Sequence, residues 1–302
     1  MYVKHTKEED MIKLVAVDLD GTFLNNRREV SKKNIEMIKK IQAMGIKFVA
    51  NTGRTYEGVQ YVLDPTQIQC DCICMNGGAV YDTEGKLMKA SYMDPAQVKD
   101  ILNCINQKEY FIEFNTQART CVTISKENAE QFIRGWMALY NNGDTSSIDE
   151  AKIVSDIKRL KNSFLYVKDI DEIYQKGHKI IKITISHKDR DKIQKLREKF
   201  SQNPKISVAA SFHTNIEITD VNADKGSALE TFAAKRNIKM EEVMAFGDSL
   251  NDYSMLKREF GYTVAMGNAI DKIKNTAKYQ TKTNEEDGVA YFINKIVLNN
   301  ES

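Results

Sequence analysis

Short apolar runs alternate with longer amphipathic stretches along the chain, and this rhythm predicts its strands and helices. The run Leu14–Val17 is wholly apolar, as in a strand that is buried on both faces. Residues 32–44 carry isoleucines at helical spacing, with Ser31 as the expected N-cap and Gly45 as the expected glycine beyond the C-terminus. Residues 46–50, apolar except for Lys47, are expected to form a second strand. A strand, a helix and a strand in succession make a βαβ unit, which predicts a parallel sheet.

This α/β pattern is interrupted near residue 85 and resumes near residue 220. Before the interruption we expect a helix at 56–63, a strand at 71–75, and a short strand with a hairpin turn at 79–86. After it we expect a helix at 227–237, strands ending at 246 and 266, and a last helix opening at 287. The pattern predicts an α/β protein whose doubly wound, Rossmann-like parallel sheet carries an insertion.

The inserted segment has the pattern of a separate α+β domain, because its helices stand among hairpin-like strands. Helices are expected at 95–107, 128–140, 149–160, 169–176 and 189–201. Strands are expected at 111–114, 120–124, 180–186, 206–210 and 215–219, with a turn at 141–144. About 130 residues suffice for a domain. We therefore divide the chain into a core, residues 1–84 and 219–302, and an inserted domain, residues 85–218.

Side chains suited to binding phosphate or a metal follow three of the expected strands and begin one helix. They are Asp18 and Asp20, Thr52, Asp248 with Asn251 and Asp252, and Lys225. The carboxyl ends of parallel strands lie along one edge of a sheet, so these groups can converge. Carboxylates gathered beside a lysine repel one another unless a cation joins them, and oxygen ligands favour Mg²⁺. Taken singly, each motif is also compatible with an Asp-Gly turn or an N-capping threonine.

Composition and charge narrow the classes of function. The 302 residues favour two domains, and 44 basic against 42 acidic side chains leave a net charge of +2. This balance gives no reason to expect a nucleic-acid or membrane partner. No apolar run nears the ~20 residues that span a bilayer. Residues 1–10 are polar and charged, so we interpret them as a frayed lead-in and not as a secretory signal.

The cysteines favour a reducing compartment. There are five of them, and an odd number without an export signal is typical of free thiols in the cytoplasm. Cys70, Cys72 and Cys74 alternate along an expected strand, and they lack the paired C-x2-C spacing of metal sites. We therefore expect three buried structural thiols on one face of that strand.

Four motifs, in order, resemble those of the haloacid dehalogenase superfamily. They are Asp-Leu-Asp-Gly-Thr at 18–22, Thr-Gly-Arg at 52–54, Lys-Gly at 225–226 and Gly-Asp-Ser-Leu-Asn-Asp at 247–252. The insertion between the second and third motifs resembles a type IIB cap. Segments 224–229, 264–269 and 287–290 are similar to the Cof-type subgroup of small-molecule phosphatases. The resemblance covers all but about ten residues at each end, and it implies the fold of that superfamily.

The resemblance implies a phosphatase mechanism for the first motif. Asp18 matches the nucleophile that forms an aspartyl-phosphate, and a carboxylate needs no base because it is ionised at neutral pH. Asp20 matches the acid that protonates the leaving group and then serves as the base for water. Mg²⁺ would be held by the Asp18 side chain, the Asp20 carbonyl oxygen and Asp248, and would screen the approach of the two anions.

The other motifs are implied to hold the phosphoryl group. Thr52 and the Gly53 amide would bind its oxygens, and Lys225 would supply positive charge. Asn251 resembles a further hydrogen-bond donor to the phosphoryl group or to the nucleophile. Asp252 is implied to orient Lys225 or the waters of the metal without binding the metal itself.

The expected function is Mg²⁺-dependent hydrolysis of a small phosphorylated metabolite, such as a sugar phosphate or a flavin-related phosphate. Two alternatives stay open: a phosphomutase, which shares the core, and a non-catalytic module that binds Mg²⁺ and phosphate. Arg54 is expected to face the inserted domain or to be solvated, and Asn51 replaces a small apolar residue of many relatives. The inserted domain would select the leaving group, with candidate side chains at Asn115, Arg119, His178, Lys182 and His213.

Overall fold

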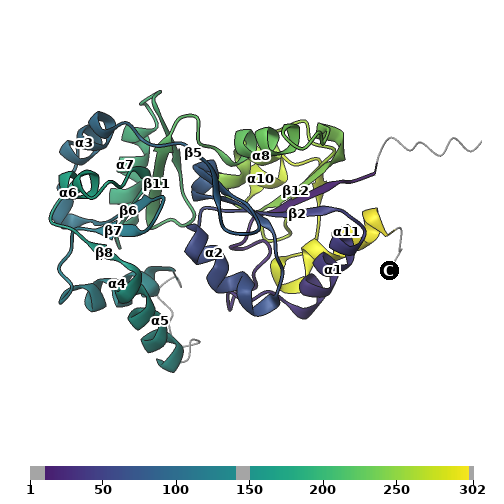
Figure 1. The fold of residues 1–302 in the computed structure, drawn as a ribbon, viewed down its shortest axis with the longest axis horizontal. Helices are drawn as coiled ribbons and strands as arrows, with labels where there is room; N and C mark the ends of the chain where they lie inside the picture. Colours follow the sequence, from purple (N-terminus) through teal and green to yellow (C-terminus); the bar gives the residue numbers. More distant parts are fainter. Residues whose placement is uncertain (1–10, 141–149, 299–302) are drawn as a thin grey trace, which may run out of the picture. The chain divides into compact units, whose positions relative to one another are not determined.

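The computed structural model describes residues 11–140 and 150–298 (Figure 1). The predictions for the lead-in at 1–10 and for the turn at 141–144 lie outside these residues. The chain divides into two compact units. One, here called the core unit, comprises residues 1–89 and 223–302, and the other, here called the inserted unit, comprises residues 90–222.

The core unit is built on an eight-stranded sheet in the order β14-β13-β12-β1-β2-β3-β4-β5. The strands are β1 (Leu14–Val17), β2 (Lys47–Asn51), β3 (Asp71–Cys74), β4 (Ala79–Tyr81), β5 (Leu87–Ala90), β12 (Val243–Gly247), β13 (Tyr262–Ala265) and β14 (Tyr279–Gln280). All neighbours from β14 to β3 are parallel, whereas β4 runs antiparallel to β3. The apolar strand β1 lies between β2 and β12 and is buried throughout. The predicted α/β fold with a mainly parallel sheet is therefore confirmed.

Helices cover both faces of this sheet. They are α1 (Lys32–Ala43), α2 (Tyr56–Leu63), α8 (Lys225–Ala234), α9 (Tyr253–Leu256), α10 (Asp271–Lys274) and α11 (Gly288–Val297). Helices α1 and α11 pack together on one face, and α8 packs with α9 on the other (Figure 1). Ser31 caps α1 by accepting a hydrogen bond from the Asn34 amide, and Gly45 follows the helix at φ +84°, both as predicted.

The inserted unit has a six-stranded sheet of its own, in the order β10-β11-β9-β6-β7-β8. Its strands are β6 (Phe111–Thr116), β7 (Thr120–Val122), β8 (Leu165–Tyr166), β9 (Ile180–Ser186), β10 (Ile206–Ala209) and β11 (Asn215–Asp220). Its helices are α3 (Pro95–Asn103), α4 (Ala129–Tyr140), α5 (Glu150–Ser163), α6 (Ile170–Gln175) and α7 (Arg190–Phe200). Apolar side chains from α3, α6 and α7 and from one face of the sheet form its main core. The predicted second, α+β fold is confirmed.

A few elements differ from the prediction, and local chemistry explains the clearest case. Helix α8 begins at Lys225 and not at Ser227, because the Asp224 side chain accepts a hydrogen bond from the Ser227 amide and so caps the helix two residues earlier. The two-residue strands β8 and β14 and the single turn of α10 have too few residues to show a periodic pattern.

The structure tests the predictions for the cysteines. Cys70, Cys72 and Cys74 are buried and carry free thiols, as predicted. The hydrogen bond with Cys70 acts to lower the pKa of Cys72, but the Cys74 thiol and burial outweigh it and raise the pKa above its ordinary value, which makes Cys72 a poor nucleophile. Within the described part of the chain, every helix is too short or too polar to cross a membrane.

Candidate active site

Strand β1 leads into Asp18, and a glycine turn follows. Asp18 directly follows the strand and is buried, with its amide bonded to the carbonyl of Phe246 on β12. Gly21 then turns the chain at φ +80°. A Cβ atom on Gly21 would lie 2.5 Å from Oδ2 of Asp248, so only glycine fits this close approach. The turn therefore brings the Asp248 carboxyl group against the backbone at Gly21.

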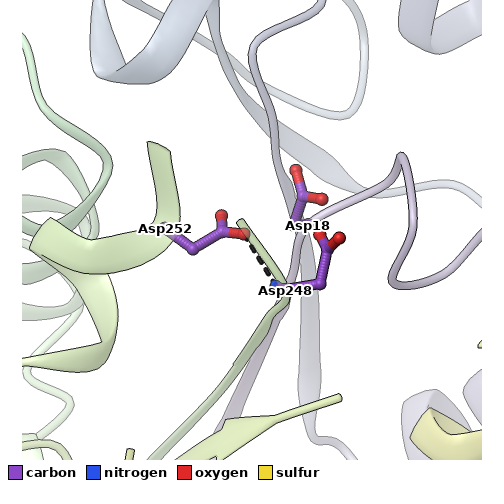
Figure 2. Close-up of side chains that lie close together, drawn as sticks. All are labelled: Asp18, Asp248 and Asp252. Carbon is purple, nitrogen blue, oxygen red and sulfur yellow. Dashed lines mark hydrogen bonds between the residues drawn. The ribbon is translucent and has the colours of Figure 1, made fainter. Parts of the chain in front are cut away.

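Lys225 joins two of the aspartates. It is the first residue of α8 and is completely buried, and its Nζ lies 2.6 Å from Oδ1 of Asp18 and 2.7 Å from Oδ1 of Asp252. The other oxygen of Asp252 accepts hydrogen bonds from the amides of Asp248, at 2.9 Å, and Ser249, at 3.1 Å. Figure 2 shows the Asp252 carboxylate reaching the main chain of Asp248, while the side chains of Asp18 and Asp248 lie next to each other. Protein donors therefore occupy both oxygens of Asp252.

The charges of these groups strongly perturb one another. Burial, together with the charge of Asp252, raises the pKa of Asp18 to about 7, although Lys225 opposes the rise. Burial and the charges of Asp18 and Asp252 also raise the pKa of Asp248 well above its ordinary value. For Lys225 burial acts to lower the pKa, but the two carboxylates outweigh it and the pKa is raised. One lysine therefore leaves this cluster short of positive charge.

This cluster fits a divalent cation. Oxygen atoms of Asp18, Asp248 and Asp252 lie within 4.8 Å of one another. Because protein groups donate to both oxygens of Asp252, this side chain holds Lys225 and the backbone amides of residues 248 and 249 in place. Asp18 and Asp248 are then the better ligands, and Thr22 Oγ1 donates to Oδ1 of Asp248 at 3.2 Å. Hard carboxylate oxygens with raised pKa values suit Mg²⁺.

The loop after β2 supplies Thr52, Gly53 and Arg54. Thr52 is buried, its amide bonds to the carbonyl of Ile73 on β3 at 2.8 Å, and its Oγ1 accepts from the Arg54 amide at 3.2 Å. The predicted alternatives for Arg54 were contact with the inserted domain or solvation. Neither alternative included the pairing that the structure shows, in which the guanidinium donates to both oxygens of Asp20, at 2.6 and 2.7 Å. Burial opposes the effect, but Arg54 lowers the pKa of Asp20 below its ordinary value.

A second asparagine connects Asn251 to Thr52. Asn251 Nδ2 donates to Oδ1 of Asn76 at 3.4 Å, and the Asn76 amide bonds to the carbonyl of Thr52 at 3.0 Å. Asn76 has a φ of +55°, and the next residue, Gly77, approaches the carbonyl of Asp224 so closely that a Cβ atom would lie 2.3 Å from it. The segment after β3 therefore contacts a candidate phosphate-binding residue, Asn251.

Several supporting residues were not predicted. Asn268 Nδ2 donates to the Gly21 carbonyl at 2.8 Å, and Asn284 Nδ2 donates to the Leu24 carbonyl at 3.0 Å, so both fix the turn that follows β1. Asn51 Nδ2 donates to the Lys225 carbonyl at 3.1 Å and holds the start of α8. Of these three asparagines, Asn268 alone lies in a segment that resembles the Cof-type subgroup, so the sequence could have indicated a role for it.

The candidate substrate-selecting residues lie in the inserted unit and differ in exposure. Lys182 is buried and its Nζ lies 3.0 Å from Oε1 of Glu217. Asn115 is also buried and bonds to Thr120 at 3.0 Å. Arg119 and His213 are exposed and His178 is half-buried. Of the five candidates, the two on the central strands of the sheet are therefore the ones that belong to an ordered polar cluster.

Comparison with known proteins places the chain in a family. The model of the haloacid dehalogenase-like hydrolases matches residues 15–293. The phosphatase YwpJ of Bacillus subtilis is 29% identical, with 95% of this chain and 100% of that protein covered. The 5-amino-6-(5-phospho-D-ribitylamino)uracil phosphatase YwtE of the same organism is 30% identical, with 95% and 98% covered. A solved haloacid dehalogenase-like hydrolase from B. subtilis superposes with a TM-score of 0.81 at 29% identity, over 94% of this chain and 100% of that one. The chain belongs to the haloacid dehalogenase-like hydrolase family and is a hydrolase of its phosphatase type.

Proposed function

We propose that this protein is a Mg²⁺-dependent phosphatase that hydrolyses small phosphorylated metabolites through an aspartyl-phosphate on Asp18. The observation that carries the proposal is the position of Lys225. Its buried ammonium group is fixed between the candidate nucleophile and Asp252, at 2.6 and 2.7 Å. A cation held beside a reactive carboxylate stabilises the charge of a transferring phosphoryl group.

In the first half-reaction, a carboxylate oxygen of Asp18 attacks phosphorus and the bond from phosphorus to the ester oxygen breaks. Protonated Asp20 gives its proton to that oxygen, which leaves as an alcohol. In the second half-reaction, water attacks the phosphorus of the aspartyl-phosphate while ionised Asp20 takes up its proton. Inorganic phosphate leaves, and Asp18 and Asp20 return to their starting states.

The remaining residues bind and orient the phosphoryl group. The Thr52 hydroxyl, the Gly53 amide and Asn251 donate to its oxygens, and Lys225 supplies charge. Asp18, the Asp20 carbonyl oxygen and Asp248 would hold the metal. Bound Mg²⁺ screens the repulsion between carboxylate and phosphate and stabilises the transferred charge. Asp252 keeps Lys225 charged and aligned toward Asp18.

The substrate class follows from the relatives and remains broad. YwtE is named for a ribityl phosphate, and YbhA of Escherichia coli, 24% identical, for pyridoxal phosphate. Both names describe phosphate monoesters of small metabolites. Both also describe phosphatases, which favours water over a second hydroxyl as the acceptor, and so favours hydrolysis over the phosphomutase alternative.

The test is phosphate release by the purified protein with Mg²⁺, first from p-nitrophenyl phosphate and then from a panel of metabolite phosphates. Asp18→Asn should release none and form no phosphoenzyme. Asp20→Asn should turn over slowly, because it lacks the proton carrier, but should still bind Mg²⁺. Asp64→Asn, a change at an exposed aspartate beyond α2, is the matched control. Equal phosphate release by the wild type and Asp18→Asn would refute the proposal.

A further inference from the structure

We infer that Arg54 is a positioning residue for the proton carrier Asp20, and that it supports the reaction of substrates whose leaving group needs a proton. This inference rests on the proposed function. It concerns the arginine of the Thr-Gly-Arg motif.

The contact between the two side chains is a fork. Arg54 Nε donates to Oδ2 of Asp20 at 2.7 Å, and Nη2 donates to Oδ1 at 2.6 Å. Two parallel hydrogen bonds fix the plane of a carboxylate as well as its position, which a single bond does not. A lysine in place of the arginine presents one ammonium group and cannot reproduce this geometry.

Arg54 is itself anchored, so it can impose a position on Asp20. Its amide donates to Oγ1 of Thr52 and its carbonyl accepts from the Met75 amide, at 3.2 and 2.9 Å. Its remaining guanidinium nitrogen, Nη1, donates to the carbonyl of Gly58 on α2 at 3.2 Å. The arginine thus connects the loop after β2 to Asp20 in the loop after β1.

Asp20 has need of such support. It follows β1 by three residues and lies just before the Gly21 turn, outside the regular hydrogen bonding of the sheet. Its side chain is 32% exposed, against 20% for that of Arg54. A half-exposed aspartate on a turn would otherwise sample several rotamers, and a proton carrier must lie within hydrogen-bond reach of the reacting oxygen.

Leaving-group dependence separates this role from the others open to Arg54. An alkyl alcohol leaves only if it is protonated, whereas p-nitrophenolate leaves readily without a proton. Loss of positioning should therefore lower kcat/KM for alkyl phosphates alone, because kcat/KM covers the steps up to release of the alcohol. Hydrolysis of the aspartyl-phosphate, for which Asp20 is the base, is common to both substrates and enters only kcat. A direct bond from Arg54 to the phosphoryl group would slow both substrates equally, and a purely structural role would lower the amount of folded protein without changing the ratio of the two rates.

The experiment measures kcat and KM of the full-length protein with Mg²⁺ for p-nitrophenyl phosphate and for the best alkyl phosphate of the panel. Arg54→Ala and Arg54→Lys should both lower kcat/KM for the alkyl ester by about 10- to 100-fold, a part of the whole contribution of a general acid. The value of kcat/KM for the aryl ester should change by no more than about threefold. Arg236→Ala removes a half-buried arginine–aspartate pair at the opposite end of β3 and is the matched control, with both rates expected unchanged.

A double-mutant cycle tests whether Arg54 acts through Asp20. In an Asp20→Asn background, Arg54→Ala should have no further effect on either substrate. Three results would overturn the inference: additive losses in the double variant, equal losses for both substrates, or faster alkyl ester hydrolysis without Arg54. The last would mean that the ion pair holds Asp20 in its ionised form and so opposes its role as the acid. If the wild type or Asp64→Asn released no phosphate at all, the proposed function would fail before Arg54 was tested.

Discussion

Replacing Lys225 by methionine tests how much of the core unit depends on its buried charges. The side chain of Lys225 is fully buried between Asp18 and Asp252, which are also buried. Methionine has a similar length and leaves little cavity, so the change removes the charge and little else. The two carboxylates would then face each other in the interior without their shared cation.

We expect Lys225→Met to lower the free energy of unfolding strongly, because the ion pairs that it removes are buried. Removing one partner of a buried ion pair costs about 3–5 kcal/mol, a substantial part of the about 5–15 kcal/mol that stabilises a domain. Lys33 provides the matched control in the same unit. Its Nζ lies 3.3 Å from Oδ2 of Asp287, but its side chain is 78% exposed, and exposed pairs contribute about 1 kcal/mol or less.

The assay is urea unfolding followed by far-ultraviolet circular dichroism, with a chelator present so that no metal offsets the lost charge. With an m-value of about 2 kcal/mol/M, Lys225→Met should shift the midpoint of the core unit by about 2 M. Lys33→Met should leave it nearly unchanged. A small, equal shift for both variants would show that the carboxylates do not depend on Lys225, and would remove the electrostatic argument for its role beside the nucleophile.

Two further variants test other parts of the chain. Burial raises the pKa of Glu113 from 4.5 to about 7, although the charge of Lys182 opposes the rise and that of Glu217 adds to it. Between these two pH values the folded protein binds a proton that the unfolded chain does not. The free energy of unfolding of the wild type therefore falls as the pH rises through this interval. Glu113→Gln should have the same free energy of unfolding as the wild type near pH 4, and a value higher by up to about 3 kcal/mol above pH 7. If the free energies of the two proteins changed in parallel with pH, this prediction would be wrong. Gly21→Ala places a Cβ atom 2.5 Å from Asp248 at a φ of +80°. The substitution should lower the free energy of unfolding by about 1–3 kcal/mol and weaken Mg²⁺ binding. An unchanged melting temperature and an unchanged Mg²⁺ titration would show that the turn relaxes.

The fold was predictable where a local pattern carries it. Strand β1 has four buried apolar residues, and α1 has a capping serine and a terminal glycine. In β9, apolar and polar residues alternate from Ile181 to Ser186. Each signal lies within one element. The antiparallel edge strand β4 shows the limit: its residues read as a strand, but its direction follows from the tight turn at 75–78, where three successive residues have positive φ.

The site was predictable as a set of residues and not as a set of contacts. The motifs identify Asp18, Lys225 and Asp252, and the structure joins them by bonds of 2.6 and 2.7 Å. The pairing of Arg54 with Asp20 leaves no trace in spacing, because the two residues lie on different loops. Asn284, which fixes the first of these loops, is 260 residues from the carbonyl it binds.

The hydrogen bonds around the four aspartates of the site distinguish their roles, which the sequence alone does not. Asp20 and Asp252 each have protein donors on both oxygens, so the fold holds them in place. In the described part of the chain, Asp18 accepts from Lys225 and Asp248 accepts from Thr22, each through Oδ1. A carboxylate whose two oxygens both accept from the protein is suited to orienting a neighbour, as proposed for Asp252. One that retains an oxygen for another partner is suited to bonding with a metal or with phosphorus, as proposed for Asp248 and Asp18. Asp20 differs from Asp252 in its partner, because the arginine that fixes it also favours its ionised form, and this form is the one that takes up the proton of water.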